Sequence, residues 1–221
     1  MNQIEYTIRY ASYHHRNQKR KYTNLPYIMH PMAVAGLIST VSDDSDMICA
    51  SILHDVVEDC EPTIFDIRKL FSKRTAELVE ELTDISRPSD GNREERKRID
   101  REHSASASPE GQTIKVADLI DNTSTIAYFD EDFARVYMRE KELLLEVLTK
   151  ADQKLVEIAN KQIIEYRLMR LEKEKDTETQ KVFTNLLFDK CKCSACNSYS
   201  NEHTKSARKA NKGPFDKLIG E

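Results

Sequence analysis

Residues 54–59 place an imidazole and three carboxylates in one short segment. If this segment is helical, residues four apart share a face, so His54 lies beside Glu58 and Asp55 beside Asp59. Burying such a strip without a partner would be costly, and a divalent metal would neutralise it. We therefore expect His54 and Asp55 to bind a metal, and Glu58 and Asp59 to act on the water beside it. A solvated helix face is the alternative.

Two further side chains could complete a metal site. His30 directly precedes Pro31, a residue suited to the first turn of a helix, so the histidine is held where a loop enters a helix. Asp118 lies in the apolar run 114–120, where a carboxylate needs a cation or hydrogen-bond donors. The ordinary alternatives are a capping or core histidine and a half-exposed aspartate. Two imidazoles and two carboxylates together fit Mn²⁺, Fe²⁺ or Zn²⁺ better than Ca²⁺ or Mg²⁺.

Three motifs occur in a fixed order: PYIMHPMAVA at 26–35, HDVVED at 54–59 and KVADLIDN at 115–122. In this order they resemble HD-domain hydrolases of the RelA/SpoT type, and especially the small stand-alone alarmone hydrolases such as the metazoan SpoT homologue. The resemblance extends from about residue 4 to residue 164. It implies an all-α HD-domain helical bundle.

The resemblance also implies a role for each matching position. The residues that match the family's ligands of Mn²⁺, or of another divalent transition metal, are His30, His54, Asp55 and Asp118. The residues that match its catalytic pair, which orients and activates water, are Glu58 and Asp59. The residues that match its substrate-binding positions are Lys19, Arg20, Lys21, Asn122 and Tyr137. The basic cluster 19–21 aligns only loosely, so which of its residues contacts substrate stays open. Cys60 stands where many members have threonine, which need not change the chemistry.

The implied activity is metal-dependent hydrolysis of the 3′-pyrophosphate of ppGpp and pppGpp, giving GDP or GTP and pyrophosphate. A bound metal makes water nucleophilic and a carboxylate accepts its proton. Basic side chains offset the phosphate charge, and residues 93–101 supply several, although most of them also fit a solvated helix face. Two alternatives remain: a phosphohydrolase for another nucleotide, such as an NADPH 2′-phosphatase, and a non-catalytic nucleotide sensor.

Composition agrees with a helical protein that binds a small nucleotide. The 221 residues include only five glycines and six prolines, and 33% are charged. A net charge of −4 argues against general nucleic-acid binding, and no stretch is apolar enough to span a membrane. With no signal-peptide pattern at the amino terminus and five cysteines, an odd number, we expect a cytoplasmic protein. The oligomeric state stays open.

Periodicity predicts helices over about 3–17, 31–40, 44–58, 63–85, 91–102, 112–128, 131–149 and 151–175, with loops at 87–92 and 104–111. We expect the phosphohydrolase domain at 1–165, and a charged helix or linker with a cysteine-containing tail, partly disordered, at 166–221. The tail residues that could bind zinc are Cys191, Cys193, Cys196 and His203. The second CxxC pair that makes such sites convincing is absent, so we do not expect zinc there.

Overall fold

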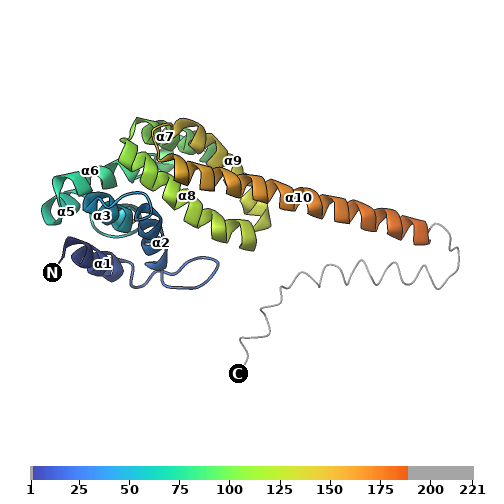
Figure 1. Ribbon diagram of the computed structural model, residues 1–221, viewed down its shortest axis with the longest axis horizontal. Coiled ribbons are helices and arrows are strands. Elements are labelled where there is room, and N and C mark those ends of the chain that lie inside the picture. The colour runs from blue at the N-terminus through green and yellow to red at the C-terminus, as the bar shows by residue number, and fades with distance from the viewer. Residues whose placement is uncertain (1, 189–221) are drawn as a thin grey trace, which may run out of the picture. The chain divides into compact units, whose positions relative to one another are not determined.

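The computed structural model describes residues 2–188, with side chains described through residue 182. This part of the chain is all-α, as predicted, with no strand and one isolated β-bridge between Lys19 and Pro26. The elements are α1 (Gln3–His14), α2 (Met29–Ile38), α3 (Ser45–Leu53), α4 (Val56–Asp59), α5 (Ile64–Leu70), α6 (Lys73–Leu82), η1 (Pro88–Asp90), α7 (Arg93–Ser106), α8 (Pro109–Phe129), α9 (Glu131–Val147) and α10 (Gln153–Phe188). Figure 1 shows their order.

Side-chain caps define where the helices start. Asn2, Thr63 and Asn92 each form a capping box with the acidic residue three positions on, which satisfies backbone N–H groups at the amino ends of α1, α5 and α7. Ser108 caps α8 directly before Pro109. These local signals explain why most helix starts could be predicted to within a few residues.

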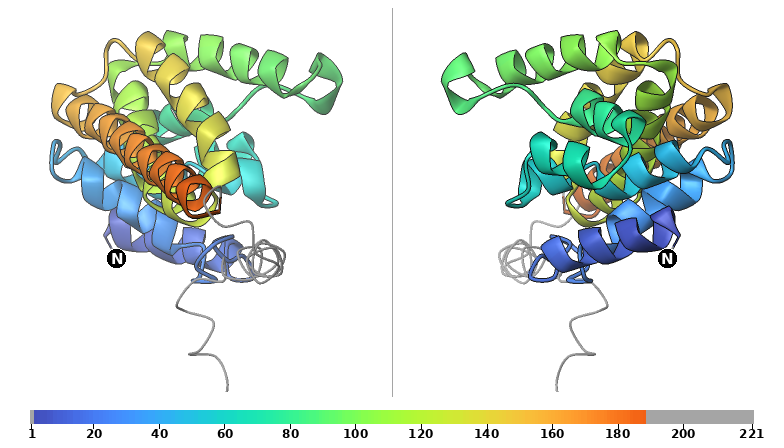
Figure 2. Two further views of the ribbon diagram at one scale, coloured as in Figure 1. Left: turned by 90° about the vertical axis from the view of Figure 1, so that its right-hand side faces the viewer. Right: turned by 90° about the vertical axis from the view of Figure 1, so that its left-hand side faces the viewer.

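Helix α8 is the central element of the first compact unit, residues Met1–Tyr166. It contacts α2 and α3 on one side and α6, α7 and α9 on the other. Figure 2 shows α1–α3 in blue at one end and α7 and α9 at the opposite end. The apolar residues of α8 are buried in a core that includes Ile52, Leu78, Ile114 and Leu155. Helix α8 therefore lies beside most of the elements that carry the predicted site residues.

The helix predicted over 44–58 is interrupted. α3 ends at Leu53 and α4 begins at Val56. Between them, Asp55 has φ −93° and ψ −6°, which lies in the bridge region that residue i+2 of a turn and many active-site residues adopt. The prediction of one continuous helical strip of charge is therefore wrong, although the backbone N–H of Asp59 still donates to the carbonyl of Asp55 at 2.9 Å.

Two other predicted boundaries are wrong. The helix expected over 63–85 is two helices, because Phe71 is extended and Ser72 caps α6 through a 2.9 Å bond from the N–H of Thr75. The loop expected over 104–111 is mostly helical, and only residues 107 and 108 separate α7 from α8. Ser104 is buried there, and its hydroxyl donates to the Asp100 carbonyl. Small polar residues predict a loop only when the chain leaves them in solvent.

The chain divides into a unit at Met1–Tyr166 and a second at Arg167–Glu221. The first 14 residues of α10 belong to the first unit, where Leu155, Ala159, Ile163 and Tyr166 are buried. Among the described residues, no helix combines the length and hydropathy needed to cross a bilayer. The cysteine tail, residues 191–203, lies outside the described residues.

Candidate active site

Four side chains from three parts of the first unit meet at one point: His30 in the first turn of α2, His54 and Asp55 at the break after α3, and Asp118 in the middle of α8. His30 Nε2 lies 3.1 Å from Asp118 Oδ1 and 3.5 Å from Asp55 Oδ2, and His54 Nε2 lies 3.1 Å from that same Asp55 oxygen. His30, His54 and Asp55 offer ligand atoms within 4.8 Å of one another. The proposed ligand set is therefore assembled.

The far nitrogen of each histidine ring is fixed by a hydrogen bond. Nδ1 of His54 donates to the Ser51 carbonyl at 2.8 Å, and Nδ1 of His30 donates to Asp121 Oδ2 at 2.6 Å. This pairing places the proton on Nδ1 and turns the Nε2 lone pair toward the cluster, the arrangement seen when histidines bind metal. Nε2 of His54 is buried without a hydrogen-bond partner among the described residues. The residues present thus fit a divalent metal.

Electrostatics in the cluster favour positive charge. Burial alone would lower the pKa of His30 and His54, yet the neighbouring carboxylates outweigh it and raise both pKa values. Burial alone would raise the pKa of Asp55, but His54 lowers it to about 2. Burial would also raise the pKa of Asp118, but the nearby rings of His30 and His54 hold it well below its usual range. A bound cation would satisfy the same two carboxylates.

Neighbouring residues orient the two carboxylates. Tyr27 donates its hydroxyl to Asp55 Oδ2 at 2.7 Å, and Asn122 donates its amide to Asp118 Oδ1 at 2.6 Å. Asn122 in turn accepts from Arg20 at 3.0 Å. Sequence reasoning anticipated Asn122 as a residue of this pocket but assigned no role to Tyr27. Such supporting bonds hold metal ligands in position.

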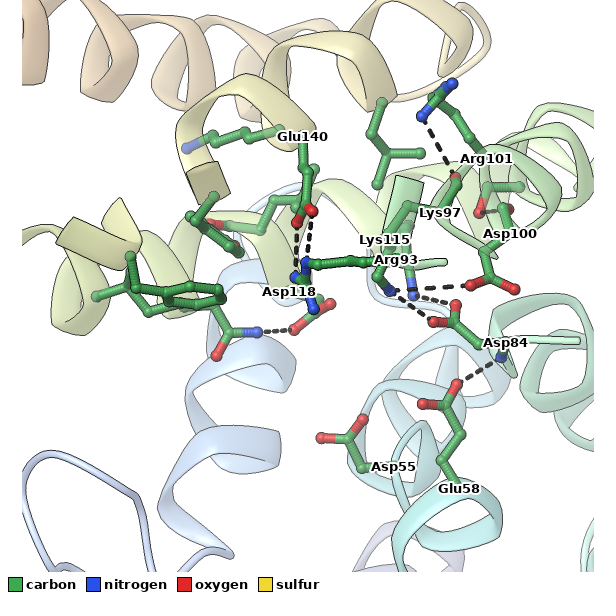
Figure 3. Close-up of a pocket in the computed structure, with 18 of the residues that line it drawn as sticks. Asp55, Glu58, Asp84, Arg93, Lys97, Asp100, Arg101, Lys115, Asp118 and Glu140 are labelled. Carbon is green, nitrogen blue, oxygen red and sulfur yellow. Dashed lines mark hydrogen bonds and ion pairs between the residues drawn. The ribbon is translucent and has the colours of Figure 1, made fainter. Parts of the chain in front are cut away.

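The two residues of the predicted catalytic pair are placed differently. Glu58 faces a cavity of about 320 Å³, here called the main cavity, which lies beside the candidate metal-binding cluster of His30, His54, Asp55 and Asp118. Its Oε1 accepts a hydrogen bond from the backbone N–H of Asp84 at 2.6 Å (Figure 3). Burial, opposed by Lys115 and reinforced by Asp84, raises the pKa of Glu58 to about 7. Asp59 does not line this cavity, and burial beside Asp55 raises its pKa. Glu58 is thus the better placed proton acceptor.

Helix α7 lines the cavity with three basic side chains at helical spacing, Arg93, Lys97 and Arg101. The neighbours Arg96 and Arg98 are not among the lining residues. The sequence showed the cluster but not which of its side chains face the cavity, because a charge run by itself also fits a solvated helix. The signal that could have separated the two groups is the i, i+4, i+8 spacing.

Sequence reasoning missed a lysine and an aspartate beside the metal-binding cluster. Lys115 of α8 lies with Nζ 3.6 Å from Asp84 Oδ1, and Lys97 Nζ lies 2.9 Å from Asp84 Oδ2. Burial alone would lower the pKa of Lys115, but Asp84, followed by Asp118 and Glu58, raises it. The amine therefore stays charged and supplies a fixed positive charge next to the cavity.

The predicted substrate-binding residues separate into three groups. Asn122 and Tyr137 line the main cavity, whereas Arg20 and Lys21 line a second cavity of about 340 Å³ that shares Asn122 with the first. Arg20 is held by Asp121 at 3.1 Å and by Asn122, while Lys21 is exposed. Lys19 is exposed and lines neither cavity, so the structure does not place it with the others.

Residues 7–110 match the family model of the HD domain. Over this range the chain is similar to an HD domain. That match contains both histidines and Asp55, and Asp118 follows it on α8. The four predicted ligands thus come partly from the matched range and partly from the helix that follows it.

Several similar proteins are named as guanosine-3′,5′-bis(diphosphate) 3′-pyrophosphohydrolases. The chain is 36% identical over 118 residues to guanosine-3′,5′-bis(diphosphate) 3′-pyrophosphohydrolase MESH1 of Drosophila melanogaster, which covers 52% of this chain and 64% of that protein. The bacterial enzyme of the same activity from Aquifex aeolicus is 33% identical over 141 residues, or 62% of this chain and 20% of that protein. The matches therefore span less than two thirds of these relatives.

A solved structure has the same fold. The metazoan ortholog of SpoT that hydrolyses ppGpp superposes with a TM-score of 0.68 and 26% identity, covering 75% of this chain and 96% of that one. The shared fold thus extends over three quarters of this chain, and the HD-type helical fold expected from the sequence is confirmed.

Proposed function

We propose that this protein is a metal-dependent hydrolase that removes the 3′-pyrophosphate of ppGpp and pppGpp. The observation that carries the proposal is the convergence of two Nε2 lone pairs and two carboxylates beside a cavity with basic side chains along one wall. The names of the similar proteins support the same substrate. Mn²⁺ suits this mixed nitrogen and oxygen ligand set.

The proposed reaction needs water, a proton acceptor and charge compensation. A bound metal would lower the pKa of water and hold phosphate oxygens. Glu58 accepts the proton as the water oxygen bonds to the phosphorus attached to ribose O3′. The P–O3′ bond then breaks, O3′ takes up a proton from solvent, and Glu58 releases its proton to solvent, so that ppGpp and water give GDP and pyrophosphate. Asp59 keeps a supporting role through its position directly after Glu58.

Substrate binding is assigned to the two connected cavities. Lys97 and Arg101 face the main cavity and offset phosphate charge, Arg by bidentate contacts and Lys as a point charge. Arg20 and Lys21 face the second cavity, and Asn122 lies between the two. A nucleotide would extend across Asn122, with its 3′-pyrophosphate toward Asp118 and its remainder toward Arg20.

Product analysis tests the proposal. Purified protein loaded with Mn²⁺ is incubated with ppGpp and, separately, with NADPH, and the products are identified by mass spectrometry. We expect GDP and pyrophosphate from ppGpp, and no reaction after chelation of the metal. Free phosphate and NADH from NADPH, with no GDP from ppGpp at matched concentration, would show that the substrate is another nucleotide. Binding of ppGpp without turnover would favour a sensor.

A further inference from the structure

Glu140 on α9 is a carboxylate inside the main cavity that the proposed chemistry does not use. Its two oxygens accept hydrogen bonds from Nε and Nη2 of Arg93 at 2.7 and 2.8 Å, so the pair joins α9 to α7 (Figure 3). A paired contact of this kind is also how arginine binds a phosphate. Glu140 therefore occupies the donors that Arg93 would otherwise offer to a ligand.

Glu140 differs from the other acidic residues of the main cavity in the residue with which it pairs. Six carboxylates line the cavity: Asp55, Glu58, Asp84, Asp100, Asp118 and Glu140. Asp55 and Asp118 contact the two histidines, and Glu58 accepts from the backbone of Asp84. Asp84 and Asp100 lie beside Lys97. Within the described residues, Glu140 forms an ion pair with Arg93 alone.

Displacing Glu140 has an electrostatic consequence. Its side chain is only 21% exposed and lines the cavity, so we expect the carboxylate to remain near the cavity when a phosphate takes its place on Arg93. A displaced Glu140 then repels the incoming anion at close range, and the repulsion grows with ligand charge. Arg93 is also near an aromatic ring, with its Cζ 5.4 Å from the centroid of Phe133, which keeps the guanidinium at the cavity wall.

We propose that Glu140 is a specificity-determining residue: an internal counter-ion that a substrate phosphate must displace from Arg93, and that disfavours the more highly charged ligands. The inference rests on the proposed function only in taking the cavity to bind phosphates. Removing the charge of Glu140 should tighten binding of pyrophosphate more than that of monophosphate, and the gain should be larger while Arg93 is present.

A double-mutant cycle tests this. The full chain is loaded with Mn²⁺, freed of excess metal and titrated calorimetrically with inorganic pyrophosphate and with inorganic phosphate. Glu140→Gln should lower the Kd for pyrophosphate by about 2- to 5-fold, the range of a partly exposed ion pair. The same substitution in an Arg93→Gln background should lower the Kd by less, because no ion pair has to be broken there and only the repulsion is removed.

Glu102→Gln is the matched control. Glu102 pairs with Arg98 at 2.6 Å on α7, outside the cavity, so this variant makes the same change in net charge and should leave the Kd unchanged. An equal shift in both variants would make the effect one of net charge and overturn the inference. So would an unchanged or weaker affinity in Glu140→Gln, or no pyrophosphate binding by any variant.

Binding without turnover separates this inference from the proposed function. If the wild-type protein fails to hydrolyse ppGpp while the cycle behaves as expected, the proposed substrate is wrong and the role of Glu140 stands. If ppGpp is hydrolysed and the cycle shows no coupling between Arg93 and Glu140, only the role of Glu140 is wrong.

Discussion

At the scale of single residues, the candidate site depends on the direction of two ring nitrogens. His30 and His54 each use Nδ1 for a bond within the protein, which leaves Nε2 directed at Asp55 and Asp118. Buried acceptors without donors are unfavourable, so this arrangement costs stability unless a cation is bound. The cost indicates that metal binding and local stability are linked.

Removal of a ligand tests that link. Asp55→Ala should abolish hydrolysis and reduce bound Mn²⁺ to background, because the remaining groups no longer compensate the metal's charge. Metal content is measured by elemental mass spectrometry after desalting. The rate of hydrolysis is measured with ppGpp as substrate. Asp43→Ala, an exposed aspartate in the preceding loop, is the control and should keep both. Full activity in a metal-free Asp55→Ala protein would refute the metal assignment.

Glu58 should control the pH dependence. Its raised pKa of about 7 means that the carboxyl is protonated and unable to accept a proton below that pH. The value of kcat/KM should therefore rise as the pH increases through 7 and level off above it. Glu58→Gln should keep the metal, lose about 10²- to 10⁴-fold in rate and lose this pH dependence. Glu61→Gln, an exposed neighbour, should retain both. An unchanged profile in Glu58→Gln would assign the proton to another group.

At the scale of elements, α8 and α9 are joined to α10 by a buried lysine. Lys141 is 1% exposed, and its amine donates to Thr123 Oγ1 at 2.8 Å and to Gln162 Oε1 at 2.7 Å. Both partners are uncharged, and burial lowers the pKa of Lys141 to about 7. The three helices are thus held by an amine that folding partly neutralises.

This lysine should make stability depend on pH. Its pKa falls from 10.5 when unfolded to about 7 when folded, so the unfolded chain binds more protons between these values. Stability should therefore rise with pH across that window, by up to about 1.4 kcal/mol per pH unit. Urea unfolding of the wild type and of Lys141→Met, compared at pH 7 and 9.5, measures the difference. Identical pH dependence in both proteins would mean that the amine stays charged.

At the scale of the whole molecule, the residues of the candidate site all lie within the unit Met1–Tyr166. The start of α10 completes the core of that unit, because Leu155, Ala159 and Ile163 are buried within it. The predicted division at 165 and 166 is a proposal that a truncation can test.

A chain ending at Lys175 should keep its metal, its activity and its free energy of unfolding to within about 0.5 kcal/mol. A chain ending at Asp152 should not fold cooperatively, because it lacks the buried residues of α10. Denaturant unfolding followed by circular dichroism compares both with the full chain. Loss of the cooperative transition in the longer truncation would show that residues beyond 175 contribute to the core.

The sequence by itself determined the helical class and the four metal-binding candidates. Helix periodicity and caps are local, and motif order identifies His30, His54, Asp55 and Asp118 without any knowledge of packing. The tertiary structure decided the rest of the site. It selected one face of α7, placed Glu58 rather than Asp59 in the cavity, and brought Glu140 to Arg93. These are contacts between residues many positions apart, and they depend on how helices pack rather than on spacing within one helix.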